Sequence, residues 1–226
     1  MSSGLRAVLW DMDGVLVLSG DVHYDAWTRV LAEYGLSMTR EQFEETFGMN
    51  NHNILRRLYD RRLSPAQAHE VATRKEQVYR ELARGRVQPL PGVREWLARL
   101  PKAGWRQAVA SSGPMANIAV ILNELDEWDA FDAVLTGARL ERSKPDPALF
   151  LQAAAAVGTP PARCVVVEDS TAGVEAARRA GMRCIAVTTT RAAEDLRSAD
   201  LVVDRLDRLP PDAFDRLVPA GGDEQQ

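Results

Sequence analysis

Two carboxylates, Asp11 and Asp13, directly follow the apolar run 7–10 and precede Gly14. A short apolar run predicts a buried strand, and the glycine predicts a turn just beyond it. In open α/β sheets, ligands bind at the edge formed by the carboxyl ends of the strands. Two carboxylates at such an edge can hold a hard cation and can also supply a nucleophile and a proton donor. The same residues are also typical of a hairpin or a solvated loop.

Two further polar segments follow apolar runs in the same way. Ser111-Ser112-Gly113 comes after the run 107–110, and Glu168-Asp169 continues the run 165–167. A small hydroxyl beside backbone N–H groups can bind a phosphate oxygen, whereas adjacent carboxylates repel each other unless a cation or hydrogen bonds compensate. Both segments also fit plainer structures, a common loop in the first case and an acidic helix cap in the second.

Lys144 stands between Ser143 and Pro145, just before a predicted helix over 148–156. A lysine held by flanking prolines can aim a fixed positive charge at a phosphate and at the carboxylate that attacks it. A solvated lysine at a proline-rich helix start is the alternative. Each signal is weak alone, but their joint occurrence at predicted strand ends favours one shared site.

The elements that must position these residues follow from the apolar runs. Strands alternating with helical patterns predict βαβ units, a mostly parallel sheet and helices on both faces, and right-handed crossovers place the strand ends along one edge. We therefore expect a Rossmann-like α/β fold. The predicted strands are 7–10, 107–110, 133–136, 164–167, 184–187 and 201–203.

A long segment without a convincing strand interrupts this alternation after the first strand. It predicts helices over 23–34, 40–47, 50–59 and 65–82, the last opened by Ser64 as N-cap and Pro65 at the first helical position. Such an insertion far exceeds ordinary loop lengths. It is either a packing layer or, as we favour, a lid over the edge that carries Asp11 and Asp13. The predicted domains are an α/β core over 1–17 and 88–220, a helical cap over 18–87 and a disordered tail over 221–226.

The composition is that of an ordinary globular enzyme or binding protein. The chain has 226 residues, 46% of them hydrophobic and 27% charged, which is enough for a packed core, and its net charge of -4 argues against binding to nucleic acid. Cys164 and Cys184 lie in apolar runs and predict buried thiols rather than a disulfide. The sequence shows no apolar stretch of transmembrane length and no signal peptide, so we expect a cytoplasmic monomer that does not bind membranes.

Taken in order, the polar segments resemble the four motifs of the haloacid dehalogenase superfamily of phosphotransferases, in members with a helical cap after the first strand. The resemblance covers about residues 5–204, and within the superfamily the chain looks most like the β-phosphoglucomutase branch and its sugar-phosphate phosphatase relatives. The first motif matches 11–16, the second Ser111, the third Lys144 and the fourth 168–170.

The resemblance implies a mechanism. Asp11 would attack the phosphorus atom and form an aspartyl-phosphate, while Asp13 would protonate the leaving oxygen and then activate the acceptor. Mg²⁺ would be held by the Asp11 carboxylate, the Asp13 backbone carbonyl and the Glu168-Asp169 pair.

The resemblance also implies how the phosphoryl group is bound. Ser111 and Lys144 would bind its oxygens, with Ser112 beside them. Gly14 would let the chain turn sharply beneath the phosphate, since glycine tolerates positive φ.

Three residues of the predicted cap are further candidates. By resemblance, His23 would contact the acid/base Asp13, and Lys75 would reach the substrate from the cap. Asn51, between Asn50 and His52, could hydrogen-bond sugar hydroxyls. The alternatives are a packed or exposed histidine, a solvated charged helix face and a helix cap.

The acceptor of the phosphoryl group decides between two activities. The mutases of this branch grip the second phosphate with a cap arginine, but the matching segment 48–52 has none, and Arg56 and Arg57 lie further along. This difference favours hydrolysis of a small phosphorylated metabolite, a sugar phosphate or similar phosphomonoester, with a β-phosphoglucomutase-type mutase as the alternative. A catalytically silent binding module is disfavoured because every expected acid, the serine and the lysine are present. A dehalogenase is also disfavoured, because its reaction needs no metal and would give Asp13 and the Glu168-Asp169 pair no role as ligands.

Overall fold

The computed structural model describes residues 4–220, and the predicted disordered tail, 221–226, lies outside the described residues. Within these residues the strands form one six-stranded parallel sheet in the order β3-β2-β1-β4-β5-β6, which confirms the predicted α/β class. The strands are β1 (Arg6–Trp10), β2 (Trp105–Ser111), β3 (Ala133–Thr136), β4 (Cys164–Glu168), β5 (Arg183–Val187) and β6 (Leu201–Val203).

The register of the central strands brings their carboxyl ends level. Trp10 at the end of β1 pairs with Val109 of β2 on one side and with Val167 of β4 on the other. The N–H of Asp11 then donates to the carbonyl of Val167 at 3.0 Å. As a result, Asp11 and the residue that follows Val167 leave the sheet side by side.

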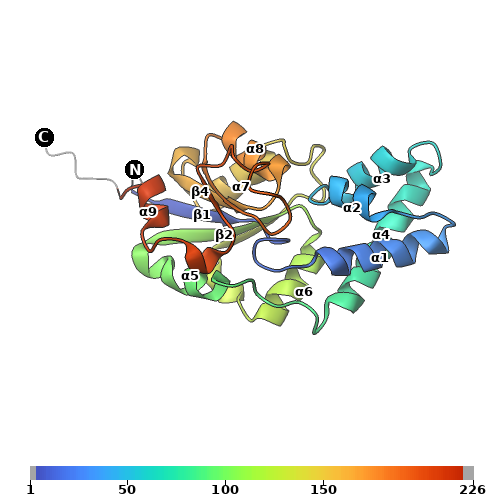
Figure 1. Cartoon of the computed structure of the whole chain (residues 1–226), viewed down its shortest axis with the longest axis horizontal. Coiled ribbons are helices and arrows are strands. Elements are labelled where there is room, and N and C mark those ends of the chain that lie inside the picture. Colours follow the sequence, from blue (N-terminus) through green and yellow to red (C-terminus); the bar gives the residue numbers. More distant parts are fainter. Residues whose placement is uncertain (1–3, 221–226) are drawn as a thin grey trace, which may run out of the picture.

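Helices cover both faces of the sheet, as the alternating pattern predicts (Figure 1). Alternation of side chains along β1 divides the core, since Val8 and Trp10 belong to one apolar cluster and Ala7 and Leu9 to the other. The first cluster includes residues of α5 (Val93–Arg99), α6 (Met115–Leu125) and α9 (Ala213–Leu217), and the second includes residues of α7 (Ala148–Ala156) and α8 (Thr171–Arg179). Within residues 4–220, short 3-10 helices lie at Pro101–Ala103, Trp128–Ala130, Pro161–Arg163 and Leu206–Arg208.

The insertion after β1 forms a bundle of helices at one end of the molecule (Figure 1). Thr39 and Ser64 each begin a helix with a reciprocal capping box, and Asn50 caps the helix that follows it. These caps explain why the three helices that they open start within one residue of the predicted positions, whereas the first helix of the bundle has no side-chain cap and starts three residues before its predicted position. The helices are α1 (Gly20–Glu33), α2 (Arg40–Thr46), α3 (Asn51–Tyr59) and α4 (Pro65–Ala83).

The bundle shares the apolar core of the sheet. Trp27 and Val78 of the bundle belong to the same buried cluster as Val8 and Val109 of the strands. We refer to 18–87 as the cap; the boundaries at 17/18 and 87/88 stay a prediction. Cys164 and Cys184 are buried free thiols, as expected. Among residues 4–220, no helix has the length and apolar composition needed to cross a bilayer.

Candidate active site

Lys144 joins two carboxylates at the ends of the two central strands. Its ammonium Nζ donates to Asp11 Oδ1 at 2.6 Å and to Glu168 Oε1 at 2.5 Å, and all three residues are buried. Burial disfavours the charged lysine, but the two carboxylates outweigh that effect and raise the pKa of Lys144. A permanent positive charge therefore lies beside the side chain that the sequence predicts as nucleophile.

Both carboxylate oxygens of Glu168 accept hydrogen bonds, one of them from Lys144. Its Oε2 accepts the backbone N–H groups of Asp169 and Ser170 at 2.8 Å each and the Ser170 hydroxyl at 2.9 Å. Burial opposes ionisation, but Lys144 and these hydrogen bonds hold the pKa of Glu168 below its usual range. A side chain at Gly173 would overlap this carboxylate, so glycine is required at that position of α8. Glu168 thus orients Lys144.

Asp169 has a different environment from its neighbour. Its Oδ2 accepts the Thr190 hydroxyl at 2.5 Å, and its carboxylate occupies the space that a Cβ at Gly14 would need. Gly14 also has a φ of +84°, which favours glycine. Burial and the negative charges of Glu168 and Asp11 raise the pKa of Asp169 well above its usual value. The motifs did not reveal Thr190, because no pattern in the sequence connects it to the strand ends.

The carboxylate oxygens of Asp11, Glu168 and Asp169 fit a divalent cation. One oxygen from each lies within 4.8 Å of the others. Burial, followed by repulsion from Glu168, raises the pKa of Asp11 to about 7 despite its contact with Lys144. When all three buried carboxylates are ionised beside one lysine they leave an excess of two negative charges, which a divalent ion would neutralise, and the raised pKa values of Asp11 and Asp169 reflect their burial and the repulsion between these charges. Oxygen donors of this kind are the ligands that Mg²⁺ prefers.

The serine segment after β2 lies on the other side of Asp11. Ser111 is buried at the end of β2, and its Oγ accepts the N–H of Gly113 at 3.1 Å. Ser112 and Gly113 line the cavity described below, together with Asp11. The structure therefore brings the serine segment to the predicted edge, with Ser112 rather than Ser111 on the cavity wall.

Asp13 faces the cap and contacts two of its residues. Its Oδ1 accepts the Ser19 hydroxyl and lies 3.3 Å from His23 Nε2. His23 is buried and stacks on Tyr79, with ring centroids 3.9 Å apart and an interplanar angle of 11°. Burial opposes ionisation of Asp13, but its interaction with His23 outweighs this and lowers the pKa of Asp13. The nucleophile candidate and the acid/base candidate thus have opposite pKa shifts.

Lys75 and Asn51 converge on a carboxylate that the motifs did not single out, Glu76. Lys75 is only 2% exposed, so it is not on a solvated helix face. Its Nζ lies 2.8 Å from His23 Nδ1 and donates to Glu76 Oε1 at 2.9 Å, and Asn51 Nδ2 donates to the same oxygen at 2.5 Å. Burial opposes ionisation of Glu76, but the positive charge of Lys75 prevails and lowers its pKa to about 2.

A cavity of about 470 Å³ separates the cap from the strand ends. Asp11 and Asp13 lie on its body side, and Asn51 and Lys75 lie on its cap side, so the predicted residues of both domains face one space. Aromatic and aliphatic side chains of the cap, among them Trp27, Phe43, Phe47, Met49 and Ile54, complete the wall. A cavity of this size and mixed character suits a small metabolite.

Arg56 and Arg57, the cap arginines that follow segment 48–52, are not among the described residues that line this cavity. Arg57 is exposed and donates to Glu45 at 3.2 Å. Arg80 and Arg139 line it instead.

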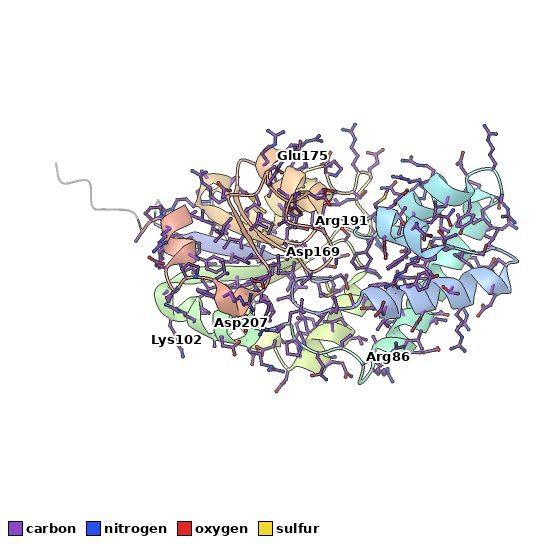
Figure 2. The ribbon with its side chains drawn as sticks, viewed as in Figure 1. Arg86, Lys102, Asp169, Glu175, Arg191 and Asp207 are labelled. Carbon is purple, nitrogen blue, oxygen red and sulfur yellow. The ribbon has the colours of Figure 1, made fainter. Side chains whose placement is uncertain are left out.

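Polar contacts also join the cap to the body around the cavity. Asn53 Nδ2 donates to Ser143 Oγ at 2.7 Å, and Arg191 donates to the carbonyl of Glu44. Figure 2 shows Arg191 and Asp169 on the part of the body that faces the cap. The cap is therefore in contact with loops at this edge of the body.

Comparison with known proteins decides the family. The model of the haloacid dehalogenase-like hydrolases matches residues 8–187, which include Asp11, Ser111, Lys144 and the Glu168-Asp169 pair. The chain belongs to this family. This result confirms the predicted resemblance. It also indicates that the chain is a hydrolase or phosphotransferase.

The similar proteins include phosphatases and mutases. Hexitol phosphatase B of Escherichia coli (strain K12) is 33% identical over 200 residues, covering 85% of this chain and 88% of the relative. Beta-phosphoglucomutase of Bacillus subtilis (strain 168) is 30% identical over 207 residues, covering 88% and 89%. The crystal structure of beta-phosphoglucomutase from Clostridium difficile superposes with a TM-score of 0.86 at 25% identity, covering 94% of this chain and 96% of that one. The chain spans 19% of a longer relative, the chloroplastic protein SUPPRESSOR OF QUENCHING 1 of Arabidopsis thaliana.

Proposed function

We propose that this protein is a Mg²⁺-dependent phosphatase that hydrolyses a small phosphomonoester, a sugar phosphate, through an aspartyl-phosphate on Asp11. The observation that carries the proposal is the buried Lys144 bridge between Asp11 and Glu168, with Asp11 facing the cavity below the cap. Asp11 Oδ1 accepts a hydrogen bond from Lys144, which fixes the orientation of the carboxylate before substrate binds. Fixing the nucleophile in this way lowers the entropic part of the barrier.

In the first step an Asp11 carboxylate oxygen forms a bond to phosphorus as the bond from phosphorus to the alcohol oxygen breaks, and Asp13 gives a proton to that oxygen. Asp13 must hold this proton when substrate is bound, although its contact with His23 favours the ionised form in the free protein. In the second step Asp13 takes a proton from water as the water oxygen attacks phosphorus, and inorganic phosphate leaves Asp11. Lys144 and the segment containing Ser111 and Ser112 bind the phosphoryl oxygens, on which the transition-state charge is spread.

The residues that would hold Mg²⁺ are Asp11, Asp169 and the backbone carbonyl of Asp13, with Glu168 completing the acidic set. Bound there, the ion supplies positive charge that offsets the buried carboxylates and the phosphoryl group. Asp169 is the better placed of the adjacent acids, since the oxygens of Glu168 already accept hydrogen bonds from Lys144 and from the start of α8.

Relatives and the cavity support a sugar phosphate as the substrate class. Hexitol phosphatase B and fructose-1-phosphate phosphatase YqaB of Escherichia coli (strain K12) are 33% and 31% identical to the chain. Asn51 and Lys75 supply polar groups on the cap wall of a cavity that fits a metabolite of this size.

A phosphosugar mutase is the second candidate, favoured by the similarity to beta-phosphoglucomutases. A mutase must keep a bisphosphate bound while that intermediate reorients in the site. A bidentate arginine is well suited to hold its second phosphate. Segment 48–52 contains no arginine, and Arg57 donates to Glu45 outside the cavity, which supports hydrolysis instead. Arg80 and Arg139 do line the cavity, but both lie outside this segment, and Arg80 donates to Asn117.

Phosphate release from a panel of sugar phosphates, phosphoglycolate and nucleotides, with Mg²⁺ and with chelator, tests the proposal. We expect Mg²⁺-dependent release that is greatest with one sugar phosphate, lost in Asp11→Asn and unchanged in Asp129→Asn, a matched control at an exposed aspartate. Release that survives chelation or Asp11→Asn would contradict it. No release from any member, with conversion of β-glucose 1-phosphate to glucose 6-phosphate, would establish the mutase.

A further inference from the structure

A continuous chain of polar contacts leaves the body, crosses the cap and returns to the body at Asp13. It begins at Asn117 on α6, whose amide is 1% exposed and donates to Glu76 Oε2 on α4 of the cap. Glu76 Oε1 accepts the ammonium of Lys75, which lies 2.8 Å from His23 Nδ1. His23 Nε2 then lies 3.3 Å from Asp13. The contacts that connect Asn117 to Asp13 in this chain are thus all made by cap side chains.

The orientation of the Asn117 amide is fixed by its two neighbours. Arg80 NH1 donates to Asn117 Oδ1 at 3.0 Å, and a guanidinium has no acceptor. Glu76, as a carboxylate, can only accept. The amide therefore presents its oxygen to Arg80 and its NH₂ group to Glu76, since the reverse orientation would set donor against donor at Arg80 and acceptor against acceptor at Glu76.

The contact between Lys75 and His23 fixes the tautomer of the imidazole in the same way. An ammonium group can only donate, so His23 Nδ1 must accept and carry no proton. The proton of the neutral ring then lies on Nε2, where it points to Asp13. Glu76 holds Lys75 in the position that imposes this tautomer, since it is the carboxylate in contact with the Lys75 ammonium.

We propose that Asn117 is a positioning residue for proton transfer by Asp13: it anchors Glu76 to the body, and through Glu76 it holds Lys75 against His23. The proposal rests on the phosphatase function above. It makes proton transfer depend on the contact between α4 and α6, so the acid/base chain is complete only when the cap lies on the body. Asn117 is not among the described residues that line the cavity, so it acts through Glu76 and not on the substrate.

Two phosphate esters with different leaving groups distinguish a role of Asn117 in proton transfer from a role in packing. p-Nitrophenolate leaves without a proton, whereas the alcohol of a sugar phosphate must receive one from Asp13. We expect Asn117→Ala to slow the first-turnover release of alcohol from the fastest sugar phosphate of the panel by roughly tenfold to a hundredfold, a part of the usual contribution of general acid catalysis. Release of p-nitrophenolate in the first turnover should change by less than about threefold.

Asn117→Asp and Asn123→Ala are the accompanying variants. The aspartate has the same shape and still accepts from Arg80, but it places a negative charge against Glu76, so we expect the selective defect of the alanine variant. Asn123 lies exposed on the same helix, where its Oδ1 accepts the indole N–H of Trp128 at 2.6 Å, so its replacement should affect neither ester. Thermal unfolding of each variant shows that the fold is retained.

Equal slowing of both esters, or wild-type rates in Asn117→Asp, would overturn the proposal, because either result indicates a role in packing. Unchanged rates with both esters in Asn117→Ala would also overturn it. A wild-type protein that hydrolyses neither ester would instead refute the phosphatase function, and with it the inference.

Discussion

Replacing Glu76 with glutamine tests the electrostatics of the cap at one buried carboxylate. Glu76 is 8% exposed and accepts hydrogen bonds from Lys75, Asn51 and Asn117. Burial disfavours its charge, but Lys75 outweighs burial and lowers the pKa of Glu76 from 4.5 to about 2. At roughly 1.4 kcal/mol for each pH unit, this difference corresponds to about 3 kcal/mol of folding free energy.

The sign follows from the direction of the pKa shift. Because the folded-state pKa lies below the unfolded one, ionised Glu76 stabilises the fold above about pH 4.5, and this stabilisation is lost as the pH falls toward about 2. The Glu76→Gln variant has no ionisable group at this position, so its stability does not include this pH-dependent contribution. The free-energy difference between the wild type and the variant should therefore shrink by about 3 kcal/mol between about pH 6 and about pH 2.

Urea unfolding of both proteins across this pH range measures the difference directly. Glu81→Gln is the matched control, because Glu81 is exposed on the same helix and should show no pH-dependent difference from the wild type. A difference between wild type and Glu76→Gln that stays constant, or grows toward low pH, would refute the assignment of Glu76 as an ionised partner of Lys75.

Three further substitutions test the strand ends. Mg²⁺ should raise the melting temperature of the wild type but not of Asp169→Asn, since binding to the folded state alone stabilises it; equal shifts in differential scanning fluorimetry would argue against Asp169 as a ligand. Gly14→Ala should cost about 1–3 kcal/mol and also abolish turnover, whereas Gly35→Ala, at a positive φ with open space around it, should leave turnover intact; both are measured by urea unfolding and phosphate release. Lys144→Met should lower kcat by roughly 10²–10³ through loss of the charge beside Asp11, and a kcat near that of the wild type would contradict the role of Lys144.

The sequence was sufficient to predict the elements because their signals are local. Strand β4 is a continuous apolar run, and α4 begins at Ser64, whose capping box with Gln67 can be read from spacing alone. The proximity of Asp11 and Glu168 was also predictable, since parallel strands bring their carboxyl ends to one edge. Lys144 comes from the loop between β3 and α7, and its place at this edge was predicted from the resemblance of its motif.

The partners of these residues depend on packing that no local pattern encodes. Glu76 and Asn117 are 41 residues apart and meet only because α4 of the cap lies against α6 of the body. The different environments of Glu168 and Asp169 are set by Thr190, which comes from the loop after β5. Sequence spacing predicted an acidic pair here, but it did not distinguish the residue that holds Lys144 from the one left for a cation.

The central claim is that Asp11 carries the phosphoryl group, and mass spectrometry of an acid-quenched reaction tests it most directly. In Asp13→Asn, p-nitrophenyl phosphate should still transfer its phosphoryl group, because its leaving group needs no proton, while hydrolysis of the aspartyl-phosphate slows for lack of a base. We predict one added phosphoryl group, located on the peptide that contains Asp11 and absent when Asp11→Asn is combined with Asp13→Asn. Release of p-nitrophenolate with no phosphoryl group on Asp11, or with one on another residue, would contradict the account.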